Sequence, residues 1–225
     1  MNKNLITLRS KWNKPFIPSM TSPSFELGYL LGAIYGDGSI SYSGRGGQIV
    51  LTVRDKDFTD YFFSCAKKVY PYYISYNIIR LGKFYTIQIS NLKYANFLDS
   101  IDISTIKEIG GGFMNGFLKG IFDAEGSVIS SYLENPRKSI KKICLYQKDK
   151  SFLEEVSLML NKLNISSKIN RTIGSGFKKY EIYHVLSIYT YNNINIFNKY
   201  IGFAIKRKQK KLELILSLFQ PYFNC

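Results

Sequence analysis

The sequence predicts an α+β fold in which an αββαββα unit occurs twice with pseudo-twofold symmetry, each half carrying one antiparallel four-stranded sheet. Residues 30–38 and 118–126 share one pattern: an apolar helical run with small residues four apart, ending in an acidic residue and a glycine. The same order of predicted hairpins and helices follows each copy. A repeat of this length exceeds a solenoid unit and suits a duplicated subdomain. We therefore predict a pseudo-dimer within one chain.

Equivalent positions define the repeat. They lie 88 residues apart and include Gly28 and Gly116, Gly32 and Gly120, Gly36 and Ala124, Asp37 and Glu125, and Gly38 and Gly126. With a six-residue insertion, residues 48–58 lie over residues 142–152. We predict a basic N-terminal extension (1–22), half one (23–107) and half two (108–225).

The composition favours a polyanionic partner. The chain has 225 residues, 45% of them hydrophobic, which is enough for a sizeable core. It carries 31 Lys and Arg against 16 Asp and Glu, a formal net charge of +15. Nucleic acid is the leading partner, because such a surface attracts polyanions. An anionic membrane surface is a weaker alternative, since the basic residues do not line one amphipathic helix.

The cysteine pattern fits a reducing, intracellular compartment. Cys65, Cys144 and Cys225 are widely spaced and include no Cys-x-x-Cys pair, which argues against a disulfide framework or a structural zinc site. Residues 1–22 contain no acid and no apolar core of signal-peptide length, so a basic arm on DNA and an organellar transit peptide are both open. The many Lys, Asn, Ile, Tyr and Phe residues match an AT-rich gene such as a mitochondrial intron.

Half one starts with a helix signal, because Ser22 can cap a helix and Pro23 is tolerated at its first position. Its predicted elements are a helix (23–36), a hairpin (39–42 and 48–54) with a Gly-rich tip, a helix (55–69), a second hairpin (75–80 and 84–90) and a short helix (94–98).

Half two repeats this order. Its predicted elements are a helix (113–124), two strands (128–132 and 142–147), a helix (151–163), a hairpin (168–173 and 180–188) and two helices (194–200 and 204–219).

The glycines of the motif helices indicate close helix packing. A glycine inside a helix costs about 1 kcal/mol relative to alanine, so three in one helix need an offsetting interaction. Small residues at i, i+4 and i+8 lie on one face and let two backbones approach. We expect the two helices to pack side by side, which brings Asp37 and Glu125 together. Because helix C-termini already carry partial negative charge, two carboxylates there call for a cation.

These residues carry a family resemblance. The segments 30–38 and 118–126 resemble the LAGLIDADG motif, and residues 23–219 as a whole resemble a single-chain LAGLIDADG homing endonuclease. The resemblance implies a saddle of two sheets that binds DNA in the major groove. It also implies a site-specific, monomeric, intron-encoded double-strand DNA endonuclease that requires a divalent cation: Mg²⁺, or Mn²⁺ or Ca²⁺ in its place.

The resemblance also implies roles for single residues. The acids Asp37 and Glu125, with the carbonyls of Gly36 and Ala124, would bind the metal. Family sites also use a polar residue after the second strand and a basic residue near the last helix of a half. These positions match Gln147 and Lys206 in half two, while Lys107 is a candidate in half one. Val53 stands where Gln147 does, which predicts unequal active sites.

Basic and polar side chains on the predicted strands and hairpin tips are candidates for contacts to DNA bases and phosphates. They are Arg45, Gln48, Arg54, Arg80, Lys83, Arg137, Lys142, Arg171 and Lys179. The single histidine, His184, lies in a predicted strand, which disfavours nucleases that depend on histidine bases.

Three other functions remain open at this stage. They are an RNA maturase that assists splicing of its intron on the same fold, a DNA-binding module without catalysis, and a protein of the membrane surface. The presence of both acids argues against a module that has lost catalysis.

Overall fold

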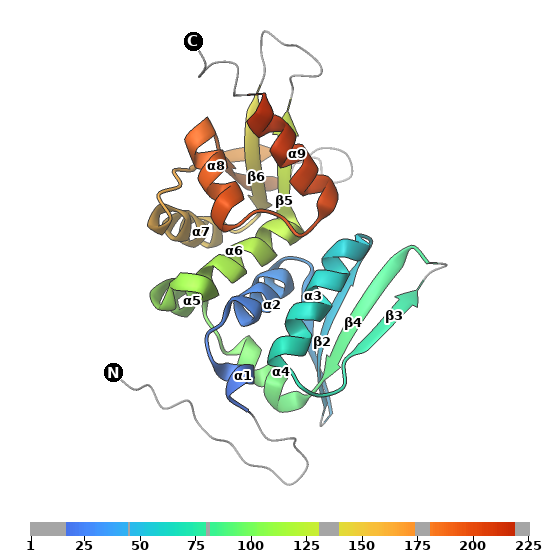
Figure 1. Cartoon of the computed structure of the whole chain (residues 1–225). Coiled ribbons are helices and arrows are strands. Elements are labelled where there is room, and N and C mark those ends of the chain that lie inside the picture. The colour runs from blue at the N-terminus through green and yellow to red at the C-terminus, as the bar shows by residue number, and fades with distance from the viewer. Residues whose placement is uncertain (1–16, 45, 80–81, 131–139, 174–180, 219–225) are drawn as a thin grey trace.

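The computed structural model describes residues 17–44, 46–79, 82–130, 140–173 and 181–218. Within these ranges the helices and strands of half one recur in half two (Figure 1). All strand pairs are antiparallel, and they form two four-stranded sheets in the orders β1-β2-β4-β3 and β5-β6-β8-β7. The predicted α+β fold with two sheets is confirmed.

Nine elements of the described chain precede the second motif helix. The last of them, α5, spans the predicted boundary between the halves. They are α1 (Pro18–Thr21), α2 (Phe25–Gly36), β1 (Gly38–Ser43), β2 (Gly46–Val53), α3 (Lys56–Val69), β3 (Ser75–Ile79), β4 (Phe84–Ser90), α4 (Leu92–Asp99) and α5 (Ile103–Ile109). The division of the chain after residue 107 stays a prediction.

The remaining elements belong to half two. They are α6 (Gly111–Glu125), β5 (Gly126–Ser130), β6 (Lys141–Gln147), α7 (Lys150–Lys162), β7 (Lys168–Ile173), β8 (Ile182–Ile188), α8 (Tyr191–Tyr200) and α9 (Lys206–Ser217). Among the described residues, no helix is both long and apolar enough to cross a membrane.

The strand register confirms the repeat that the sequence predicts. Gly38 faces Leu51 in half one, and Gly126 faces Leu145 in half two. Gly126 follows Gly38 by the 88 residues that separate the two motifs. Leu145 follows Leu51 by the same 88 residues plus the predicted six-residue insertion. Each sheet therefore begins directly after the acid of its motif helix, so sheet and acid have a fixed relation.

The two motif helices pack along each other at the centre of the molecule (Figure 1). A Cβ added at Gly28 would lie 2.0 Å from the carbonyl oxygen of Phe113, and one at Gly32 would lie 2.1 Å from that of Phe117. At Gly116 the added atom would lie 2.0 Å from the carbonyl oxygen of Phe25. Since contacts advance along both helices in the same direction, α2 and α6 run parallel.

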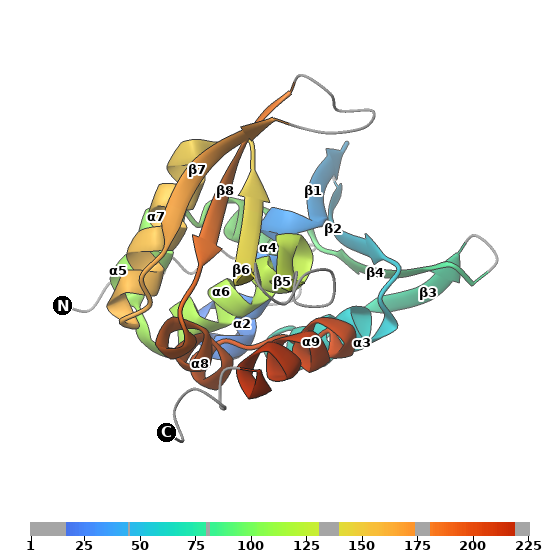
Figure 2. The ribbon, with the colours of Figure 1, turned by 90° about the horizontal axis from the view of Figure 1, so that it is seen from above.

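One hydrophobic core joins the halves. A single cluster of buried side chains includes Leu27 and Leu30 of α2, Phe117 and Phe122 of α6, and residues from both sheets. Figure 2 shows the two sheets as the walls of an open V, with α3 against the sheet of half one and α7 against that of half two. The acid-bearing ends of α2 and α6 lead into β1 and β5, which belong to these two sheets.

Two local features differ from the sequence prediction. Ser24, not Ser22, caps α2 and accepts a hydrogen bond from the Leu27 amide at 3.2 Å, because the proline that follows Ser22 keeps that residue extended. The short helix α5 was not predicted. Asp102 caps it, and it packs between α6 and α7 through the buried Ile106.

We predict that Gly32→Ala destabilises the fold by about 1–3 kcal/mol or more, because the new methyl group would overlap the carbonyl of Phe117. Urea unfolding followed by circular dichroism measures this. Gly112→Ala is the matched control: its Cβ would meet only the Cβ of Phe25, at 4.0 Å, so we expect a gain of up to about 1 kcal/mol. Equal stability of the two variants would contradict backbone contact between the helices.

Candidate active site at the ends of the motif helices

The two acids of the motif lie at adjoining helix ends. Asp37 is the C-cap residue directly after α2, and Glu125 is the last residue of α6. A Cβ added at Gly36 would lie 2.3 Å from the Cβ of Ala124 and 3.3 Å from the Cγ of Glu125. The backbone contact between the helices thus extends to their C-terminal ends and brings one acid of each half to the same place.

The surroundings of Asp37 disfavour its negative charge. Partial burial raises the pKa of the Asp37 carboxyl; the ammonium of Lys208 opposes this rise, and the charge of Asp55 adds to it. The backbone carbonyls at the helix C-termini contribute further negative potential. This junction therefore stabilises cations.

Lys208 of α9 supplies one such cation. Its side chain is buried, and its Nζ donates to the carbonyl oxygens of Phe122 (3.2 Å), Ala124 (3.3 Å) and Asp123 in the last turn of α6. Burial lowers the pKa of Lys208 to about 8, with Asp123 opposing this effect. An ammonium group with such a pKa is able to donate or release a proton near neutral pH.

Lys206, the candidate basic residue of half two, is the first residue of α9. Its side chain is exposed, and its backbone amide donates to Oδ2 of Asp57 at 2.5 Å. Lys208, two residues on, projects from the opposite side of α9. Helical periodicity held the signal that would have found it, because Lys208 shares a face with the buried residues Leu212 and Ile215.

Lys107, the candidate basic residue of half one, lies away from the acid-bearing ends of the motif helices. This lysine lies in α5, and its Nζ is 2.6 Å from Oε2 of Glu155. Helix α5 adjoins the N-terminal end of α6, and the 15 residues of α6 span about 22 Å from there to the acid ends. Lys107 therefore belongs to an ion pair between α5 and α7.

Gln147 and Val53 occupy equivalent places in the two sheets. Each lies two residues beyond the leucine that faces the first glycine of the preceding strand. Gln147 is partly exposed at the end of β6, whereas Val53 is buried in the core at the end of β2. The two halves thus have different side chains at this position of their second strands.

Asp123 is a site residue that the sequence reading missed. It is 1% exposed and accepts hydrogen bonds from Tyr29 Oη (2.9 Å) and from the amides of Ala204 (2.9 Å) and Ile205 (3.3 Å). Burial raises the pKa of Asp123, and Lys119 is the first of several groups that oppose the rise. Its hydrogen bonds fix the segment that leads into α9.

The donor set at the junction fits a hard divalent cation. In the part of the chain that the structure describes, no three His, Cys, Asp or Glu side chains come together. The oxygen donors are the carboxylates of Asp37 and Glu125 and the terminal carbonyls of Gly36 and Ala124. Mg²⁺ suits such a set, since it is often held by one or two carboxylates with waters and substrate phosphates.

The candidate DNA contacts divide into described and undescribed residues. Gln48, Arg54, Lys83 and Arg171 are exposed, and Lys142 is partly exposed on β6. The guanidinium of Arg54 lies 5.0 Å from the ring centre of Phe84, and the Nζ of Lys142 lies 5.8 Å from that of Tyr189. The other four candidates, Arg45, Arg80, Arg137 and Lys179, lie outside the described residues.

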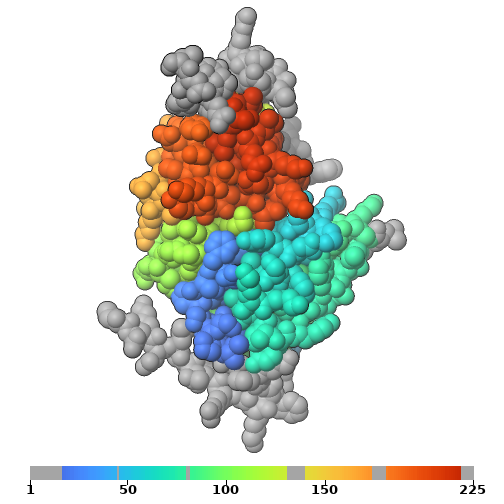
Figure 3. All heavy atoms as spheres, viewed as in Figure 1, coloured from blue at the N-terminus to red at the C-terminus, as the bar shows by residue number. Residues whose placement is uncertain are grey.

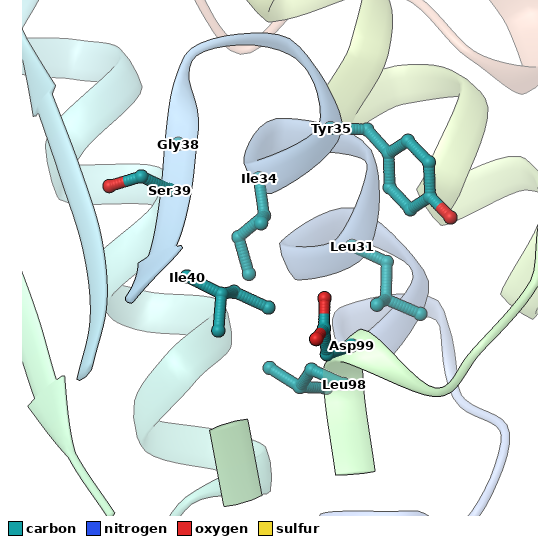
Figure 4. A pocket seen from close by; sticks show the side chains of 8 residues that line it. All are labelled: Leu31, Ile34, Tyr35, Gly38, Ser39, Ile40, Leu98 and Asp99. Atoms are coloured by element: carbon teal, nitrogen blue, oxygen red, sulfur yellow. The ribbon is translucent and has the colours of Figure 1, made fainter. Parts of the chain in front are cut away.

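A pocket of about 220 Å³ lies beside the junction on the side of half one (Figure 4). Its lining combines the aliphatic side chains of Leu31, Ile34, Ile40 and Leu98 with the polar side chains of Tyr35, Ser39 and Asp99. Its carboxylate, Asp99, already accepts a hydrogen bond from Tyr42 at 2.9 Å. The pocket contains neither acid of the motif, so it is separate from the candidate site.

Residues 112–202 match a family model described as a LAGLIDADG-like domain. An uncharacterized protein of Methanocaldococcus jannaschii is 30% identical over 209 residues, which cover 87% of this chain and 73% of that protein. A probable translation initiation factor IF-2 of Thermococcus kodakarensis matches at 34% identity over 101 residues, which are 45% of this chain and 7% of the factor.

Solved structures share the fold. The homing endonuclease I-DmoI, in complex with DNA and manganese, superimposes with a TM-score of 0.58 at 22% identity, over 80% of this chain and 97% of that one. Full-length DUF199/WhiA from Thermatoga maritima gives a TM-score of 0.58 at 20% identity, over 91% of this chain and 62% of that one. With two motif copies on parallel central helices, two antiparallel sheets and these relatives, the chain belongs to the LAGLIDADG family.

Proposed function

We propose that the chain is a metal-dependent endonuclease that hydrolyses both strands of double-stranded DNA at a long, asymmetric target. The observation that carries this proposal is the pair of carboxylates, one from each half, at the adjoining ends of two parallel helices. I-DmoI has been crystallised with DNA and with manganese or calcium, which supports DNA and a divalent cation as partners here.

Asp37 and Glu125, with the carbonyls of Gly36 and Ala124, would hold the cation. A bound divalent metal lowers the pKa of a water molecule and stabilises charge on the phosphate and the leaving oxygen. A bound cation would favour the ionised form of Asp37, because its attraction opposes the rise in pKa that burial causes there.

Lys208 and Gln147 would act on the reacting groups. The Nζ of Lys208 lies at the end of α6 and carries protons that can stabilise negative charge developing on a phosphate oxygen. Gln147 offers both a donor and an acceptor at the end of β6 and can orient a water molecule. Because Val53 replaces this amide in half one, the two strands of the target would be cut at unequal sites.

The walls of the V would bind the DNA. A formal net charge of +15 attracts the phosphate backbone, and the exposed side chains of β2, β6 and β7 can contact base edges or phosphates. Since one chain supplies both acids and both sheets, a monomer would cut both strands.

An RNA maturase is the alternative function, because a basic surface suits RNA as well as DNA. A mitochondrial, intron-encoded origin also stays a prediction, and the two sequence relatives named above, from Methanocaldococcus jannaschii and Thermococcus kodakarensis, are archaeal. Intron RNA as a partner also stays a prediction.

We predict that wild-type protein with Mg²⁺ cuts a DNA duplex that represents the insertion site. In this duplex, the two sequences that flank the protein's reading frame are joined directly and the reading frame is left out. Asp37→Asn and Glu125→Gln each slow cleavage by about 100-fold or more, since each removes a carboxylate that holds the metal. Gel assays of cleavage and of DNA binding measure both effects, and binding is expected to stay within about twofold.

The control for these variants is Glu154→Gln. Glu154 is an exposed acid paired with Lys150, and its loss should leave cleavage unchanged. A wild-type protein that binds this duplex and cuts neither strand with Mg²⁺ or Mn²⁺ refutes the proposed function. Cleavage by Asp37→Asn at the wild-type rate refutes the role of the carboxylate.

We predict that Lys208→Met slows cleavage by about 100-fold yet raises the free energy of unfolding at pH 7. Burial disfavours the protonated form of Lys208 in the folded state, and this lowers its pKa from 10.5 to about 8. The shift corresponds to a loss of about 3 kcal/mol in the free energy of unfolding at pH 7, as an upper figure. The unfolded state binds more protons between pH 8 and 10.5, so the wild type gains stability there and the difference shrinks.

Urea unfolding at pH 7 and at pH 10 measures this effect. Lys206→Met is the matched control, since that side chain is exposed: it should change stability by less than about 0.5 kcal/mol and leave cleavage within a few-fold of wild type. If the two variants exchange these behaviours, the assignment of Lys208 is wrong.

A further inference from the structure

Helix α9 begins in an electrostatically unfavourable way. Its first three residues are Lys206, Arg207 and Lys208, which place positive charge at the positive end of the helix dipole. The preceding residue, Ile205, offers no side chain to accept hydrogen bonds from the first amides, and the first turn contains no acid. The helix therefore depends on anions from another element to begin where it does.

Half one supplies these anions. Oδ2 of Asp57 accepts from the Lys206 amide at 2.5 Å. The carboxylate of Asp55 receives two parallel hydrogen bonds from Arg207, with Nε to Oδ1 at 2.9 Å and Nη2 to Oδ2 at 2.7 Å. Both acids lie at the start of α3, and in Figure 3 the red spheres of α9 adjoin the cyan and teal spheres of α3 across the border between the halves. We call Asp55, Asp57 and Arg207 the clamp.

The repeat within the chain shows that the clamp differs from the ordinary use of these positions. The equivalent of Asp55 is Asp149, which caps its own helix α7 by accepting from the Ser151 amide at 2.8 Å. Asp55 precedes α3 in the same way but makes no side-chain capping bond. The equivalent of Asp57 is Ser151 itself. Half one has thus given up a helix cap in favour of a contact to half two.

Stability alone does not account for this exchange. The side chains of Arg207 and Asp55 are 66% and 29% exposed, and exposed ion pairs add little to stability. The clamp does, however, fix the first turn of α9, and the next residue along is Lys208, whose ammonium contacts three carbonyls at the end of α6. Loss of the clamp would free that turn and displace the ammonium.

We propose that Asp55 and Asp57 of half one are positioning residues which, through Arg207 and the first turn of α9, hold Lys208 at the acid-bearing ends of the motif helices. The proposal rests on the proposed function for its effect on cleavage. It adds a dependence that neither motif copy reveals: the lysine comes from half two, whereas the residues that aim it come from half one.

Cleavage kinetics of clamp variants test the proposal. In Asp55→Ala, the single-turnover rate at saturating DNA should fall about 10-fold to 100-fold, because small displacements of a catalytic group have effects of this size. Affinity for DNA should stay within about twofold of wild type. The charge exchange Asp55→Arg with Arg207→Asp should recover most of the lost rate, which a purely structural loss would not allow.

The control is Asp149→Ala, which removes a true helix cap. Its melting temperature should fall while its cleavage rate stays at the wild-type value, the reverse of the behaviour expected for Asp55→Ala. If both variants slow cleavage in proportion to their loss of melting temperature, the clamp is only structural and the proposal is overturned.

Lysine labelling tests the clamp without cleavage. In wild type, reductive methylation followed by mass spectrometry should find Lys208 protected, since it is 7% exposed. Asp55→Ala with Arg207→Ala should label Lys208 several-fold faster, and Asp149→Ala should not. A protein that cuts no target but shows this response upholds the clamp and refutes the proposed function. Unchanged labelling and unchanged cleavage in the clamp variants overturn the clamp alone.

Discussion

Direct backbone contact between α2 and α6 is the constraint on which the rest of the structure depends. Added methyl groups at Gly28, Gly32, Gly116 or Gly120 would lie within 2.3 Å of a carbonyl oxygen on the facing helix, so only glycine permits this approach. The helices run parallel, and each is followed at once by the first strand of its sheet. Parallel contact therefore fixes both the spacing of the sheets and the meeting of Asp37 with Glu125.

The same contact creates an electrostatic problem, and the chain answers it unequally in its two halves. Two helix C-termini and two acids concentrate negative potential, which a cation relieves. Lys208 approaches from α9 to supply positive charge, and Asp123 and the residues at the start of α3 hold the segment that carries it. In half one, α5 leads into α6 at the opposite end of the motif helices, and its Lys107 pairs with Glu155 there. The repeated motif helices and sheets are symmetric, whereas the helices that follow each sheet, α5 and α9, lie in different places.

The sequence predicted the two sheets and the packed motif helices, but it did not show which lysine of α9, Lys206 or Lys208, contacts the end of α6. Repeated glycines, the motif acids and the insertion before Gln147 predicted a four-stranded sheet in each half and the equivalence of the two halves, because these features act locally or through one dominant packing contact. The choice of Lys208 over Lys206 depends on which face of α9 meets α6, and the capping of that helix by Asp57 joins residues from separate halves. The sequence did not predict the short helix α5, because its stability comes from Ile106, which is buried against other elements.

Anomalous diffraction from crystals of the chain with duplex DNA and Mn²⁺ tests whether close helix packing assembles one cation-binding junction from both halves. We expect an anomalous peak for manganese at the carboxylates of Asp37 and Glu125, with Lys208 beside the end of α6. Manganese bound to DNA or to other side chains, with both of these carboxylates empty, would contradict this expectation.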